Sequence, residues 1–184
     1  MSRAAGIVAG LVLLAAPASA APWSVDYAKS SLGFTVLWSK EPFMGSFKSW
    51  KAAIEFDPAN LAASRADVTV ALASETSDEP DVDAGLKGDL GFAAARFPMA
   101  HFVARNFSRR SGNRYVARGT LSLKGVTKDV TLPFTLAIDG KSAHMTGTAV
   151  VMRNAYGVGS GLWAAPDPVA YEVKVNIDIV ATAR

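Results

Sequence analysis

The sequence predicts an all-β domain of at least eight antiparallel strands, with a short helical segment over one end. Three observations support this fold class. Apolar residues recur at every second position over most of the chain, turn residues separate these runs, and a single segment has helical spacing instead. Period-two alternation is typical of half-buried antiparallel strands. The pattern fits a sandwich or a closed barrel, and we favour the barrel because closure also removes exposed sheet edges.

The expected strands are identified by apolar residues that share one face. In chain order these sets are Leu32, Phe34, Val36 and Trp38; Trp50, Ala52, Ile54 and Phe56; Val68, Val70 and Leu72; Ala100, Phe102 and Ala104; Tyr115, Ala117, Gly119, Leu121 and Leu123; Val130, Leu132 and Phe134; and Val173, Val175, Ile177 and Ile179. Successive side chains of a strand point to opposite faces, so each set is expected to point into the domain.

The segment from Asp81 to Phe97 is expected to be helical. Val82, Leu86, Leu90 and Phe97 stand at helical spacings in it, and Pro80 precedes it, where a first helical turn tolerates proline. Three glycines within the segment weaken the prediction, since each costs about 1 kcal/mol relative to alanine. They either allow close backbone approach to the sheet or divide the segment into two short helices.

Residues 1–20 are expected to be a cleaved secretory signal peptide. Arg3 gives a positive start, an apolar run follows from Ile7 to Ala16, and Ala18-Ser19-Ala20 matches the small-residue cleavage pattern. The apolar run is shorter than the roughly 20 residues needed to span a bilayer. We therefore expect an exported, soluble domain of residues 21–184 that does not span a membrane, and a periplasm is the simplest compartment.

Charge and cysteine content exclude several function classes. After cleavage the chain would carry 18 basic and 16 acidic residues, a balance that does not suit nucleic-acid binding. The arginines on either side of Ser111-Gly112-Asn113 are read as a solvated hairpin loop. The chain has no cysteine, which excludes a thiol nucleophile, thiolate metal ligands and a lipidated N-terminus.

No catalytic or metal-binding arrangement is visible. The two histidines, His101 and His144, lie in different expected strands, and two histidines without cysteine make a weak zinc site. Gly159-Ser160-Gly161 lacks the strand-to-helix setting of a reactive serine. We expect no catalytic residue, no metal and no cofactor.

An apolar interior remains as the candidate functional feature. A barrel of eight strands is filled by side chains or is just wide enough for one small ligand. Small and aromatic residues alternate on the inward faces, which is compatible with an aromatic-lined tunnel or with an interlocked solid core.

Several segments together resemble the YceI family. The resemblance rests on Trp23-Ser24-Val25-Asp26, Gly45-Ser46-Phe47, Phe97-Pro98, Leu121-Ser122-Leu123-Lys124-Gly125-Val126-Thr127-Lys128 and Arg153-Asn154-Ala155-Tyr156-Gly157, in this order along the whole mature chain. It implies an extended, lipocalin-like antiparallel barrel and a periplasmic protein that holds a polyisoprenoid, such as a quinone, within it. Trp38 stands where the family commonly has histidine and would narrow the tunnel, which favours a shorter lipid.

On this interpretation the chain binds, transports or stores a lipid and is not an enzyme. The residues expected to line the tail tunnel are Phe34, Val36, Trp38, Trp50, Ile54, Phe56 and Phe102, with Leu86, Leu90 and Phe92 at its helical cover. Arg153, Asn154 and Tyr156 are expected to contact a polar headgroup or to close the end of the barrel. In the second case Arg153 would pair with Asp26.

Two other function classes stay open. An enzyme acting on an isoprenoid-like lipid would place His101 beside an inward carboxylate. An adaptor for a membrane redox protein would have a filled barrel and no extractable lipid. Exposed apolar strand surface is compatible with a homodimer, although no pattern requires one.

Overall fold

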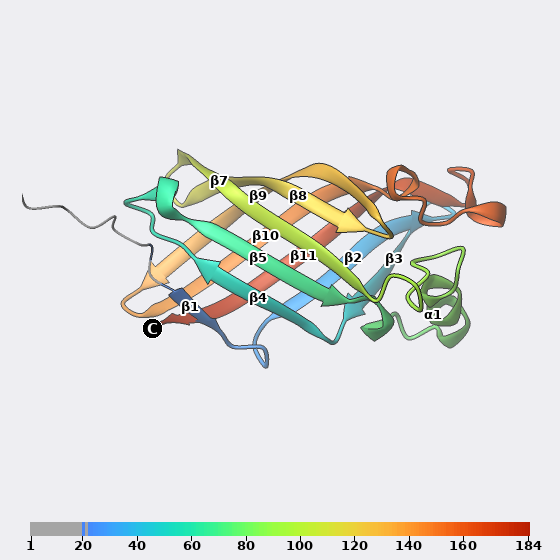
Figure 1. The fold of residues 1–184 in the computed structure, drawn as a ribbon, viewed down its shortest axis with the longest axis horizontal. Coiled ribbons are helices and arrows are strands. Elements are labelled where there is room, and N and C mark those ends of the chain that lie inside the picture. Colours follow the sequence, from blue (N-terminus) through green and yellow to red (C-terminus); the bar gives the residue numbers. More distant parts are fainter. Residues whose placement is uncertain (1–19, 21) are drawn as a thin grey trace, which may run out of the picture.

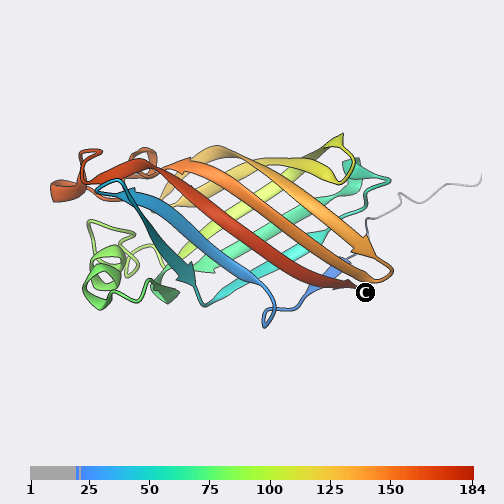
Figure 2. The ribbon, with the colours of Figure 1, turned by 180° about the vertical axis from the view of Figure 1, so that it is seen from behind.

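The computed structural model describes residue 20 and residues 22–184, and in them the chain forms a closed antiparallel β-barrel (Figures 1 and 2). The predicted signal peptide, residues 1–20, lies outside the described residues except for Ala20. The strands that build the wall are β1 (Pro22–Val25), β2 (Ser31–Trp38), β3 (Glu41–Phe47), β4 (Trp50–Glu55), β5 (Arg65–Ala71), β7 (Met99–Ser111), β8 (Arg114–Leu123), β9 (Val126–Asp139), β10 (Ser142–Met152) and β11 (Val169–Ala183).

The wall of the described chain has eight strand positions, because three of them are each made of two segments. β1 and β2 both pair with β11, one after the other along its length. On their other side β4 pairs with β1 and β3 pairs with β2. The short β6 (Glu75–Thr76) continues the line of β5 and pairs with the end of β3. Closure comes from β1, which pairs with β4 on one side and with β11 on the other. The predicted barrel of about eight strands is confirmed.

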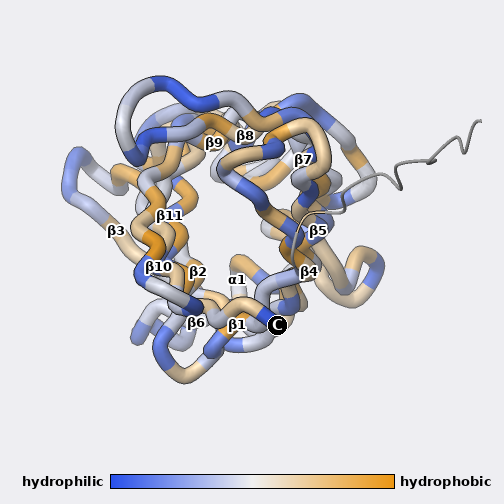
Figure 3. The backbone as a smooth tube through the Cα atoms, turned by 90° about the vertical axis from the view of Figure 1, so that its left-hand side faces the viewer, coloured by the Kyte–Doolittle hydropathy of each residue, from blue (hydrophilic) through white to orange (hydrophobic). Residues whose placement is uncertain are grey.

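The closed ring of strands is visible along the barrel axis in Figure 3. Its longest ladder joins β10 and β11 without interruption from Ser142 opposite Thr182 to Met152 opposite Glu172. Long uninterrupted pairing satisfies backbone hydrogen-bonding groups that would otherwise be costly to bury. The ladders therefore hold the wall in a chain that has no disulfide.

The helical segment is shorter than predicted. Helix α1 spans Pro80–Lys87 and ends at Gly88, whose backbone N–H bonds to the Ala84 and Gly85 carbonyls. The prediction of a helix extending to Phe97 was wrong, because the chain after Gly88 is a series of turns. α1 and this following segment lie at the same end of the barrel as the long connection between β10 and β11 (Figure 1).

Glycines allow close approach at two places. The Cβ of an alanine at position 85 would lie 2.8 Å from the Trp163 ring, so α1 packs through Gly85 against the β10–β11 connection rather than the sheet. The Cβ of an alanine at position 119 would lie 2.1 Å from the Val103 carbonyl oxygen. The neighbouring Ala104 is completely buried, at a bulge in the β7–β8 pairing. Small residues there let the two strands come close together.

Among the described residues, none of the helices is both long and apolar enough to cross a bilayer.

Candidate functional site

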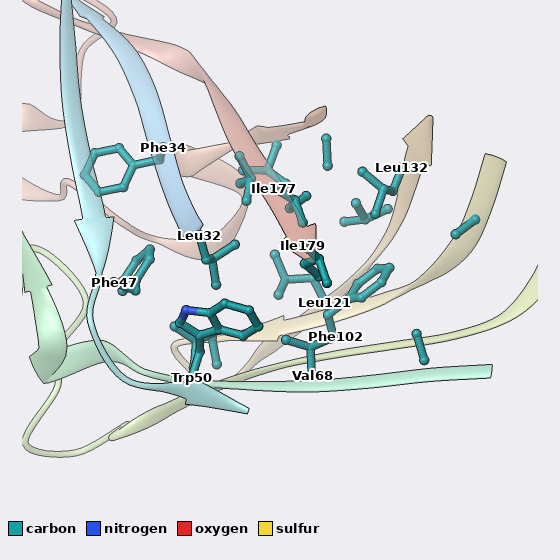
Figure 4. A pocket seen from close by; sticks show the side chains of 18 of the residues that line it. Leu32, Phe34, Phe47, Trp50, Val68, Phe102, Leu121, Leu132, Ile177 and Ile179 are labelled. Carbon is teal, nitrogen blue, oxygen red and sulfur yellow. The ribbon is translucent and has the colours of Figure 1, made fainter. Parts of the chain in front are cut away.

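The barrel encloses a cavity of about 290 Å³ whose lining is almost entirely apolar. Figure 4 shows side chains from opposite walls pointing into it, including Phe34 and Ile177 on one side and Trp50, Val68 and Phe102 on the other. The inward faces predicted from the alternation supply most of the lining. The volume is at the low end of the roughly 300–1,000 Å³ typical of small-molecule sites. The interior therefore has room for one apolar ligand.

Most of the residues expected in a ligand site lie around this cavity. Its lining includes Phe34, Val36, Trp50, Ile54, Phe56, Leu86, Phe92, Phe102, Arg153 and Tyr156. These side chains come from strands far apart in sequence, from α1 and from the connections at the covered end. The fold therefore brings these ten residues together around one cavity.

Three expected site residues do not line the cavity. Trp38 is the last residue of β2, and its ring packs against Phe43 with centroids 5.6 Å apart. Leu90 is 45% exposed because α1 has already ended before it. Asn154 is exposed on the 3-10 turn Arg153–Tyr156, in which Arg153 and Tyr156 are the buried residues. Trp38, which was expected in the tail tunnel, therefore does not line it. Leu90 does lie in the cover, where it was expected, because its carbonyl oxygen accepts hydrogen bonds from Gly159 and Ser160, but its side chain does not line the cavity.

Other lining residues were missed. β10 contributes Ala143, Met145, Ala149 and Val151, which alternate along the strand. This alternation could have been found, although two alanines and Gly147 make it weak. Phe47, at the end of β3, also lines the cavity. Proline and glycine within β3 hide its strand character in the sequence.

An aromatic cluster fills the end of the barrel opposite α1. The Phe56 ring meets the rings of Phe107, Tyr115 and Phe134 with centroids 5.4 to 6.0 Å apart. Tyr115 and Phe134 stack on one another at 5.5 Å. Such pairs stabilise a core beyond the burial of their surface. The interior thus combines a solid aromatic plug with an open cavity, so both interpretations of the inward residues hold in different parts of the barrel.

Arg153 closes the covered end of the barrel through backbone contacts. It is only 6% exposed, and its guanidinium donates to the carbonyl oxygens of Val158, Gly159, Ala165, Val169 and Ala170 at 2.6 to 3.1 Å. A guanidinium has five N–H donors, so this set occupies all of them. Burial lowers the pKa of Arg153. These contacts are the ones that a residue closing the end of the barrel would make. The expected pairing of Arg153 with Asp26 is wrong, since Asp26 pairs with Lys29 at 3.3 Å.

Tyr156 lies beside this arginine at the covered end. It is buried, and this burial, together with the charge of Asp129, raises the pKa of its phenol. The phenol is therefore neutral over the ordinary pH range. It adds a polarisable, uncharged surface to the lining.

Lys124 ties two parts of the cover to the barrel. Its ammonium donates to the carbonyl oxygens of Asp89, Gly91 and Gly157 at 2.7 to 2.8 Å. Burial lowers its pKa, with a smaller effect from the charge of Arg96. The backbone N–H of Gly159 also donates to the Leu90 carbonyl at 2.8 Å. The segment after α1 and the β10–β11 connection therefore form one hydrogen-bonded cover.

Neither histidine is near the cavity. His101 pairs with Asp67 at 2.7 Å and His144 pairs with Asp178 at 2.8 Å, and all four side chains are substantially exposed. Ala100 and Phe102, on either side of His101 in β7, point inward and line the cavity. An enzyme was expected to place His101 beside an inward carboxylate. The partner of His101 is instead the exposed carboxylate of Asp67.

Comparisons with known proteins agree with the architecture. The family model described as YceI-like domain matches residues 23–181. A UPF0312 protein of Photorhabdus laumondii is 31% identical over 140 residues, which are 74% of this chain and 72% of that protein. The crystal structure of Burkholderia cenocepacia BcnA superposes with a TM-score of 0.84 at 33% identity, covering 86% of this chain and all of that one.

A more distant likeness extends the fold comparison. A structure described as a polyisoprenoid binding domain from Saccharophagus degradans, implicated in plant cell wall breakdown, superposes with a TM-score of 0.67. At 16% identity, over 89% of this chain and 99% of that one, it shows a shared fold. The family match spans the barrel from β1 to the last residues of β11, and this chain therefore belongs to the YceI-like family.

Proposed function

We propose that this protein binds an amphiphile with an isoprenoid tail, such as a quinone, inside its barrel, and transports or stores it in the periplasm. The observation that carries the proposal is the cavity of about 290 Å³ lined by apolar side chains. Burying a prenyl chain there stabilises the complex by roughly 25 cal/mol per Å² of apolar surface removed from water. The name of the Saccharophagus degradans domain, which has the same fold, supports the same ligand class.

The size of the cavity favours a short isoprenoid chain. The aromatic plug of Phe56, Phe107, Tyr115 and Phe134 occupies one end of the barrel, so the chain would lie between this plug and the cover. An apolar ligand needs no charged partner for its tail, and the wall offers it none. The proposed role is binding without a catalytic step, and an open cavity is contrary to an adaptor with a filled barrel.

A filled-cavity variant tests the proposal. Val68 lines the cavity from β5, whereas its neighbour Thr69 points to the other face of the strand. Val68→Trp should occupy ligand space and weaken binding of a short-tailed ubiquinone, measured by titration of the delipidated mature protein. Thr69→Trp is the matched control and should bind as the wild type does. Equal binding by all three proteins, each shown to be folded, would contradict the proposal.

A further inference from the structure

Glu75 is a buried acid at the covered end of the barrel. Its exposure is 1%, and both of its carboxyl oxygens are buried without a hydrogen-bond partner among residues 20 and 22–184. Buried polar groups in folded proteins are nearly always paired, since an unpaired one costs about 1–3 kcal/mol. An acid that is retained in such a place therefore calls for an explanation.

The position of Glu75 links it to the ligand cavity. Glu75 stands directly opposite Phe47 in the β3–β6 pairing, so the two side chains lie on the same face. Phe47 and Phe34 both line the cavity, and their rings are 6.0 Å apart. A Cβ added at Gly45 would lie 2.4 Å from Cζ of Phe34 and 3.0 Å from Oε1 of Glu75. The carboxyl thus lies beside the aromatic rings that border the apolar space.

The surroundings of Glu75 favour its neutral form below about pH 7. The pKa of this carboxyl is raised to about 7, mainly by burial and then by the charge of Asp83 on α1, while the charge of Lys87 on the same helix lowers it. β2 and β3 present apolar side chains, Phe34 and Phe47, on this side. A neutral carboxyl has one O–H donor and one carbonyl acceptor. It can therefore form two hydrogen bonds with a group that both donates and accepts.

We propose that Glu75 is the polar anchor of the cavity and binds the hydroxyl end group of an uncharged amphiphile whose apolar chain lies in the barrel. This inference rests on the proposed function and narrows its ligand class. An alcohol hydroxyl satisfies both carboxyl oxygens, whereas an oxidised quinone offers only acceptors. An anionic end group such as a phosphate or carboxylate is disfavoured by the charge of Asp83.

The test compares two probes of the same chain length, farnesol with a hydroxyl and farnesene without one. Glu75→Met replaces the acid by an apolar side chain of similar length, and it should weaken farnesol binding about tenfold, the equivalent of one hydrogen bond. Farnesene binding should change less than about twofold, because no hydrogen bond is lost. Glu75→Gln keeps a donor and an acceptor and should retain farnesol binding within about threefold.

The controls separate this inference from the proposed function. Glu79→Met removes an exposed acid next to α1 and should leave the binding of both probes unchanged. Glu75→Leu replaces Glu75→Met if that variant does not fold. If the apolar variant weakens both probes equally, or neither, the anchor role is overturned while the binding function stands. If the wild type binds neither probe, the proposed function fails and this inference fails with it.

Discussion

The ammonium of Lys124 donates a 2.7 Å hydrogen bond to the carbonyl oxygen of Gly91, and this contact ties the cover to the barrel wall. Lys124 lies in the tight turn between β8 and β9, and Gly91 belongs to the segment that follows α1. The Phe47 and Phe92 rings meet nearby with centroids 6.1 Å apart. The hydrogen bonds of Lys124 thus hold the cover together with an apolar contact that also borders the cavity.

Lys124→Met should loosen the cover without unfolding the barrel. The substitution removes hydrogen bonds to three carbonyl oxygens, so we expect a loss of about 2 kcal/mol in the free energy of unfolding. Amide hydrogen exchange should accelerate in residues 88–98 and stay unchanged in β10 and β11. Lys128→Met, on the exposed part of β9, is the control. Unchanged exchange in the cover would mean that Lys124 does not hold it.

Arg153→Met should be among the most destabilising single substitutions. It leaves five carbonyl oxygens without their donor, and the expected cost is about 3–5 kcal/mol in urea unfolding. Arg153→Lys should recover little of this, because an ammonium lacks the planar set of five donors. Arg118→Met removes an exposed arginine and should cost less than about 0.5 kcal/mol. Similar urea midpoints for Arg153→Met and Arg118→Met would contradict the structural role of Arg153.

Stability should fall as the pH rises through the titration of Glu75. The folded protein keeps this proton up to about pH 7, whereas the unfolded chain releases it near pH 4.5. The folded state therefore binds more protons between these values, and the free energy of unfolding decreases there by roughly 3 kcal/mol. Urea unfolding at pH 5 and pH 8 should show this decrease in the wild type. Glu75→Gln has no titrating carboxyl at this position, so the contribution of Glu75 to the decrease in its free energy of unfolding should be missing. If the decrease is as large in Glu75→Gln as in the wild type, Glu75 is not its cause.

Gly119→Ala should destabilise the barrel wall. The added methyl group would meet the Val103 carbonyl oxygen at 2.1 Å, so β7 and β8 would have to separate locally. Overpacking of this kind costs typically about 1–3 kcal/mol. Thr120→Ala, at the exposed neighbouring position, is the control for changing a residue of β8. Equal thermal midpoints for both variants would show that the strands are less closely packed than the structure indicates.

The barrel and its inward faces were predictable because each long strand carries its own period-two pattern. Leu32 to Val36 and Val173 to Ile179 alternate in sequence, and both runs face the cavity. No long-range information is needed to identify such a face. The position of Trp38 was not predictable in this way, because the strand ends at this residue and its ring turns to Phe43.

The cover and the polar anchor depend on contacts between distant segments. The segment that follows α1 is fixed by hydrogen bonds that link Leu90 to the β10–β11 connection, about 70 residues later in the chain. Glu75 lies in a strand of two residues, which is too short to show a period. Its burial arises only when β3 pairs with β6 and brings Phe47 opposite it. A charged residue in a turn-rich stretch would otherwise be expected at the surface.

The central claim is that the cavity holds an apolar ligand, and native mass spectrometry of the protein purified from its own host tests it most directly. The spectrum should show the chain with one additional bound mass, and organic extraction should release a neutral isoprenoid amphiphile in near-stoichiometric amount. Val68→Trp, purified in the same way, should carry much less of it. A wild-type protein that is folded, carries no extractable lipid and takes up none when it is offered would contradict the account.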